Sequence, residues 1–230
     1  MRRAAHGPAR SYGDGARRAV PVAIAVLAFG ITFGVLAREA GIGPLAAILM
    51  SATTLAGSAQ FAAASVLAAG GGASTAVLAA ALLNVRYLPI GVSVAPWLEG
   101  SLLRRLLTAH LIVDESWAIA ADGPGRWNPR VLVGAGTSVL AAWVGGTAIG
   151  VASGDLLGDP TRFGLDAAFP ALFVALLAPQ LRSAGARLAA ALGATIALAL
   201  VPLSAPGVPI VAATAAALVG LRSGRSETPR

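Results

Sequence analysis

The strongest constraint on this chain is a series of long apolar runs that carry almost no charge. In the run 74–98, Arg86 is the one charged residue, and it lies near the middle. A helix needs about 20 apolar residues to cross the hydrocarbon core of a bilayer. The chain is 57% hydrophobic and 12% charged, against about 25% charged in soluble domains. These runs predict an integral membrane protein and argue against a soluble helical core.

Hydropathy divides the chain into an all-α polytopic bundle of seven to eight transmembrane segments. Glycine, proline and polar residues inside several runs leave room for discontinuous helices. The predicted spans are 19–37, 44–69, 74–98, 106–121, 131–153, 165–181, 187–201 and 208–221.

The distribution of arginine predicts the orientation of the chain. Residues 1–18 form a basic tail, 19–221 a transmembrane transporter domain and 222–230 a second tail with three arginines. The positive-inside rule places both tails in the cytoplasm of a cell whose inner membrane holds the protein. Arg104 and Arg105 would then face outward. Either 106–121 is re-entrant or interfacial, or 44–69 is broken, and the sequence leaves both open.

A weak internal similarity leaves a repeat open. A shift of 116 residues lays "GITFGVLA" (30–37) on "GTAIGVAS" (146–153), with three identities in eight. If 19–98 and 131–203 were repeat halves with an odd number of spans, the second half would be inverted, as in many transporters. The GxxxG spacing of the glycines in these stretches predicts close helix packing.

Arg86 is costly where the sequence places it. A charge at the centre of a membrane helix costs roughly 2.5–3.5 kcal/mol on insertion scales, so Arg86 should face protein or water and have an acceptor. Pro89 removes the hydrogen bond to the carbonyl of Val85 and would free that carbonyl beside the guanidinium. Asn84 and Tyr87 share a helix face nearby. Arg86 either locks two helices through an ion pair or anchors an anionic group such as a carboxylate.

The segment "LIVDESWAIA" (111–120) supplies the natural counter-charge. Asp114 and Glu115 are adjacent acids flanked by apolar residues, with His110 one helical turn earlier. One carboxylate would pair with Arg86, and the other would hold a substrate ammonium or a proton. The alternative is that the segment lies at the membrane interface and that its acids are solvated.

The run 44–69 contains small and polar residues around Gly57, Ser58 and Gln60. On a continuous helix Gln60 points away from the stripe of small residues, which would then serve helix packing. A break at Gly57-Ser58 would turn Gln60 inward and expose backbone groups, as discontinuous transporter helices do at their binding sites.

Several functions find no support in the sequence. The absence of cysteine excludes disulfides and thiol chemistry, and only two histidines are present. There is no GxSxG, HExxH or GxxxxGK[ST] motif, so we expect neither an enzyme nor a cofactor or metal site. The arginines form no stripe interleaved with aromatics, which argues against nucleic-acid binding.

Five stretches in order give the chain a family resemblance. They are "AFGITFGVLAREAGI", "MSATTLAGSAQF", "LNVRYLPIG", "DESWAIA" and "LDAAFPALFVALLAPQL". Together they resemble the AzlC family of bacterial branched-chain amino acid permeases over roughly 19–221. The resemblance implies the large subunit of a two-component exporter of leucine, isoleucine and valine, working with a small AzlD-like membrane protein.

The chemistry of the charged candidate residues agrees with this resemblance, and we expect an alternating-access exporter coupled to protons. Arg86 would take the substrate carboxylate, Asp114 or Glu115 its ammonium, and the apolar surroundings its side chain. A channel or exporter for another small solute is the alternative. A subunit that does not transport would have no need of a charge at mid-membrane.

Overall fold

The computed structural model describes residues 11–123, 125–157, 183–204 and 208–216, together with residues 174, 177, 178 and 181. Within them the chain is all-α, as predicted, apart from one isolated bridge between Ala121 and Trp127. The helices are α1 Tyr12–Glu39, α2 Pro44–Thr54, α3 Gly57–Ala68, α4 Ala73–Asn84, α5 Tyr87–Val94, η1 Ala95–Trp97, α6 Leu102–His110, α7 Asp114–Ala120, α8 Pro129–Leu157, α10 Ala184–Leu200, α11 Val208–Ala213 and η4 Thr214–Ala216.

Fewer helices span a membrane than hydropathy predicted. Among the described residues α1 and α8 are long and apolar enough, and α4 with α5–η1, which are bent by 45° at their break, make a third candidate when they are taken as one span. The runs 44–69 and 106–121 are each broken into two short helices, so both predictions of a single span are wrong. The predicted span 165–181 lies almost wholly outside the described residues, and α10, with 17 residues, is a shorter apolar helix.

The first helix begins within the predicted N-terminal tail. It starts at Tyr12 rather than at residue 19, because Ser11 caps it. The Ser11 hydroxyl accepts from the Asp14 amide (3.2 Å), and the Ser11 amide donates to the Asp14 carboxylate (2.7 Å). This reciprocal capping box satisfies two backbone donors that a helix start otherwise leaves unpaired. The helix therefore carries Arg17 and Arg18 on its first turns.

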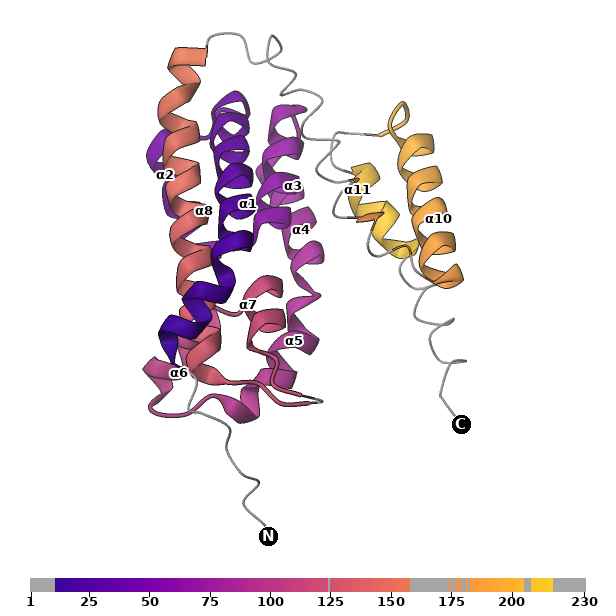
Figure 1. Ribbon diagram of the computed structural model, residues 1–230. Helices are drawn as coiled ribbons and strands as arrows, with labels where there is room; N and C mark the ends of the chain where they lie inside the picture. The colour runs from indigo at the N-terminus through magenta and orange to yellow at the C-terminus, as the bar shows by residue number, and fades with distance from the viewer. Residues whose placement is uncertain are drawn as a thin grey trace.

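The helices α1 and α8 form the central contact of the fold, and they run in the same direction (Figure 1). Gly30 faces Gly146, and Gly34 faces Gly150, so the contacts keep a constant offset of 116 residues. A Cβ on Gly30 would lie 2.7 Å from the Trp143 carbonyl oxygen, which shows how closely the backbones approach. The predicted packing role of these glycines is confirmed.

This parallel arrangement changes the meaning of the similarity between 30–37 and 146–153. Inverted copies of one helix run in opposite directions, whereas these two stretches lie side by side in parallel helices. They are therefore not inverted copies of each other, and the expectation of an inverted repeat based on them is wrong. They share a glycine spacing because both stretches contribute glycines to the same close contact between α1 and α8.

Two re-entrant hairpins lie between α1 and α8 in the sequence. The α2–α3 hairpin starts at the end where α1 finishes, reaches mid-height and returns, since α3 packs antiparallel to α4 through Ala63, Val66, Ala76 and Ala79. The α6–α7 hairpin does the same from the end where α1 and α8 begin (Figure 1). Both breaks that the sequence had left as alternatives are present.

The hairpins resolve the conflict over Arg104 and Arg105. With α6–α7 re-entrant, these arginines lie at the end where α1 and α8 begin, which we call the arginine-rich end. It also carries Arg17, Arg18 and Arg126, and a single side of a membrane accommodates them all.

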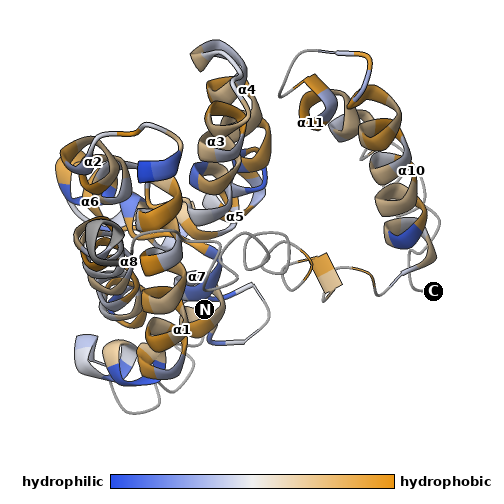
Figure 2. Cartoon of the chain, turned by 90° about the horizontal axis from the view of Figure 1, so that it is seen from above, coloured by the Kyte–Doolittle hydropathy of each residue, from blue (hydrophilic) through white to orange (hydrophobic). Residues whose placement is uncertain are grey.

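Figure 2 shows that most residues of α3, α4 and α10 are apolar. The helix α10 packs on α11, which in turn contacts α4.

We expect the α1–α8 interface to tolerate no added methyl group. In Gly146→Ala the new Cβ would meet the Leu27 carbonyl oxygen, whereas a Cβ at the neighbouring Gly145 has nothing within 4 Å. Overpacking of this kind costs about 1–3 kcal/mol, so Gly146→Ala should lower the melting temperature of the protein in detergent. Gly145→Ala is the matched control. Equal melting temperatures for the two variants would contradict the interface.

Candidate functional site

A small cavity, lined mainly by apolar residues with a few charged and polar side chains, lies at mid-height between the hairpins. Its lining includes Val26 and Trp143, which stand at the midpoints of α1 and α8 respectively. The cavity holds about 170 Å³, below the roughly 300–1,000 Å³ of pockets for drug-sized ligands. It can therefore accept a small solute, and its position corresponds to the middle of the membrane-spanning helices.

Arg86 lies at the break between α4 and α5 and faces this cavity. One guanidinium nitrogen (Nη1) is 3.0 Å from Asp114 Oδ2, and the other (Nη2) donates to Ser58 Oγ at 2.8 Å. The guanidinium carbon also stands 5.2 Å from the centre of the Tyr87 ring, within cation–π range. The sequence had offered both Asp114 and Glu115 as partners for Arg86, and the structure pairs it with Asp114. Arg86 and Asp114 keep side-chain exposures of 44% and 42%, so both can also contact a solute.

The acids come from the tip of the α6–α7 hairpin. Val113 is extended, and α7 begins at Asp114. The buried Ser116 fixes this turn, because its hydroxyl accepts from the Val113 amide (3.0 Å) and donates to the Leu111 carbonyl (2.7 Å). Glu115 lines the cavity, and its side chain makes no ion pair with any other residue that the structure describes. The hairpin thus presents one paired and one unpaired carboxylate.

The opposite wall of the cavity comes from the tip of the α2–α3 hairpin. Of the two alternatives that the sequence left open, the break is present, and it falls at Leu55 and Ala56, directly before Gly57. Leu55 adopts the left-handed conformation (φ 42°), which is strained for a leucine. Gly57 lies against the Trp143 ring, and a Cβ there would be 3.1 Å from it. Gly57 and Ser58 both line the cavity.

Gln60 turns inward, but it is fully buried and does not line the cavity. Its Oε1 accepts from the Trp143 indole (2.9 Å) and the Ala56 amide (3.3 Å), and its Nε2 donates to Ser51 (3.1 Å). Ser51 in turn bonds to Thr147 at 2.8 Å. Gln60 therefore holds the α2–α3 break against α8 instead of meeting a solute.

The kink at Pro89 has a different consequence from the one predicted. The Val85 carbonyl is not left for the arginine, since it accepts from the Leu88 amide at 3.0 Å. The break also separates Asn84 from Tyr87, so that Tyr87 lines the cavity and Asn84 does not. Within the described residues the Asn84 Oδ1 is buried without a hydrogen-bond partner.

Sequence reasoning missed two features of this centre. Trp143 stacks on Phe33, with ring centres 5.7 Å apart, and it fills one wall of the cavity. Its indole N–H in an otherwise apolar run required a partner, and that was a usable signal. His110 donates from Nε2 to the Ala52 carbonyl (2.9 Å), which joins the tips of the two hairpins. No sequence pattern indicates this contact.

The fold and the cavity define a class: a polytopic helical membrane protein whose helices break around a charged centre at mid-height. A family model described as AzlC protein matches residues 21–157. The chain is also 33% identical over 205 residues to an "Uncharacterized membrane protein" of Archaeoglobus fulgidus, covering 85% of this chain and 87% of the relative. The chain belongs to the AzlC family. No solved structure matches it.

We expect Gln60→Leu to destabilise the protein. The change leaves the Trp143 indole and the Ala56 amide as buried donors without their acceptor, and each costs about 1–3 kcal/mol. The melting temperature in detergent should fall well below that of Thr53→Ala. Thr53 is an exposed residue beside the same break that bonds only to the Leu49 carbonyl of its own helix. Equal melting temperatures for the two variants would show that the network does not hold the hairpin.

Proposed function

We propose that this protein exports branched-chain amino acids across the inner membrane by alternating access, as the large subunit of a two-component system. The observation that carries the proposal is the cavity at mid-height, where Arg86, Asp114 and Glu115 meet in apolar surroundings. The chain belongs to the AzlC family, and membership of this family implies transport of branched-chain amino acids. The family therefore supports the proposed substrate class.

The chemistry of the cavity is complementary to a zwitterion with an aliphatic side chain. The guanidinium of Arg86 is suited to grip a carboxylate, and Glu115 offers an unpaired oxygen acceptor for an ammonium. Val22, Val26 and Val139 supply the apolar wall. A leucine-like solute would thus satisfy each polar group of the cavity and bury its side chain against valines.

The two hairpins give alternating access a structural basis. Each enters from a different end of the bundle, and each ends at the cavity, so movement of one would open the cavity to one side only. The contact between His110 and the Ala52 carbonyl joins their tips. Glu115 is the group we assign to proton coupling, because it faces the cavity without a cationic partner among the described residues. Proton exchange at Glu115 would change the charge that the substrate ammonium meets.

The distribution of arginines supports the proposed orientation, and the family resemblance supports the proposed partner. We place the arginine-rich end in the cytoplasm, as the positive-inside rule requires. The family resemblance implies an AzlD-like small membrane subunit. The end of α10 and the turn after it carry exposed apolar residues, among them Leu198 (74%), Val201 (63%) and Leu203 (79%). This surface can contact either that subunit or lipid.

An efflux assay tests the proposal. In cells preloaded with labelled leucine, Arg86→Gln and Asp114→Asn should each lower the initial efflux rate about tenfold or more, since 1.4 kcal/mol corresponds to a factor of ten. The exchanged pair, Arg86→Asp with Asp114→Arg, should recover part of the loss. Arg126→Gln, in an exposed loop, is the control for a lost charge.

Two results would go against the proposal. Normal leucine efflux in well-expressed Arg86→Gln would remove the cavity from the mechanism. Flux that an uncoupler leaves unchanged would favour the alternative, a channel or passive exporter for small solutes. A panel of amino acids, with and without the small subunit, defines the substrate class.

A further inference from the structure

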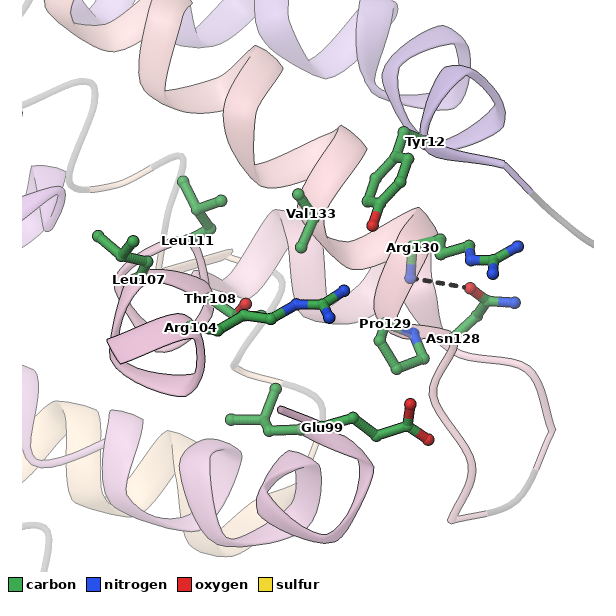
Figure 3. Close-up of a pocket in the computed structure, with 11 residues that line it drawn as sticks. Tyr12, Glu99, Arg104, Leu107, Thr108, Leu111, Asn128, Pro129, Arg130 and Val133 are labelled. Atoms are coloured by element: carbon green, nitrogen blue, oxygen red, sulfur yellow. Dashed lines mark hydrogen bonds between the residues drawn. The ribbon is translucent and has the colours of Figure 1, made fainter. Parts of the chain in front are cut away.

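A second and larger cavity opens at the arginine-rich end (Figure 3). It holds about 750 Å³ and lies between the start of α1, the segment before α6, α6 itself and the start of α8. The polar residues Tyr12, Glu99, Arg104, Thr108, Asn128 and Arg130 line it together with leucine, proline and valine side chains. Figure 3 shows the Arg104 guanidinium and the Tyr12 hydroxyl directed into the space between these elements.

The helix α6 shows that this cavity is suited to hold water within the protein. Leu102, Leu103 and Leu106 are exposed by 72%, 67% and 58% on its outer face, whereas Arg104 and Thr108, one turn apart, line the cavity. In a membrane the apolar face of such a helix meets lipid, and its polar face must meet protein or water. The distribution of residues on α6 therefore fits the wall of an aqueous vestibule.

The charges in this vestibule are available to a ligand. Neither Arg104 nor Glu99 makes an ion pair with another residue in the described part of the chain. The stem of Arg104 lies over Gly100, where a Cβ would be 2.8 Å from Arg104 Cδ. Gly100 has a φ of 97°, a conformation that glycine adopts without strain. The turn at Gly100 places the Arg104 guanidinium and the Glu99 carboxylate on the same cavity.

The vestibule is separated from the central cavity by a single turn. Leu111 lines the vestibule and Val113 lines the central cavity, and both belong to the tip of the α6–α7 hairpin. Leu111 packs on α8 at Gly136, where a Cβ would be 2.7 Å from the Leu111 Cβ. We infer that a shift of this tip would connect the two cavities.

We propose that the vestibule is a first binding site for zwitterionic amino acids with aliphatic side chains, reached before the central cavity. Arg104 holds the carboxylate, Glu99 the ammonium, and Leu107, Leu111 and Val133 the side chain. The inference rests on the proposed export function, because it takes its substrate class from it. It differs in location and in residues from the centre at Arg86.

Transport into inverted membrane vesicles tests the vestibule. These vesicles expose the arginine-rich end to the medium and carry the full chain with its small subunit. Arg104→Gln should raise the KM for labelled leucine about tenfold and leave the maximal rate near that of the wild type, because a charge-assisted contact is lost before the translocation step. Arg104→Lys should recover part of the affinity. The matched control is Arg105→Gln, because Arg105 is adjacent and exposed but does not line the cavity.

A second readout tests Glu99. The wild type should prefer leucine to 4-methylpentanoate, the same molecule without its ammonium, as a competitor for labelled leucine uptake. Glu99→Gln should reduce that preference. If Arg104→Gln shows the same KM as Arg105→Gln, or if Glu99→Gln keeps the full preference, the vestibule site is wrong while the export function stands. If wild-type vesicles take up no leucine, the export function itself fails.

Discussion

Arg86 connects three chain segments that would otherwise end separately in the middle of the molecule. It sits at the break of α4 and α5, bonds to Ser58 at the start of α3 and pairs with Asp114 at the start of α7. Broken helices leave backbone groups unpaired, which is costly away from water. A single guanidinium with its two acceptors holds all three breaks at one height. The cavity exists because these breaks coincide.

The frame around that centre is built on glycine rather than on charge. The helices α1 and α8 approach so closely that Gly30 and Gly34 lie on Gly146 and Gly150. Without a hydrophobic driving force between helices in lipid, close van der Waals packing of this kind is what associates them. The stacked rings of Phe33 and Trp143 extend the contact to the edge of the cavity. This parallel pair thus forms the frame against which both hairpins pack.

Sequence reasoning identified the parts of this arrangement that follow from local chemistry. A lone arginine in an apolar run had to have a counter-charge, and the adjacent acids at 114 and 115 were the obvious source; the structure pairs Arg86 with Asp114. The break beside Gly57 was one of two alternatives, raised because Gln60 would point away from the small residues on a continuous helix. Hydropathy did not predict that the runs 44–69 and 106–121 turn back within the membrane. An apolar segment that turns back has the same composition as one that crosses. Gln60 was assigned to the wrong surroundings, because its partners Ser51 and Trp143 are distant in sequence or across the break.

The meeting of the two hairpins at mid-height has an electrical consequence. If water fills the vestibule up to the tip of α6–α7, the insulating part of the protein is confined to the half of the bundle between that tip and the opposite end. The membrane potential then falls over a shorter distance, and a charge that crosses this barrier experiences most of it, about 2.3 kcal/mol per elementary charge for 100 mV. The turn 111–113 would therefore stand where the steep fall in potential begins, so a displacement of the charges of Asp114 and Glu115, which directly follow it, would be sensitive to the membrane voltage.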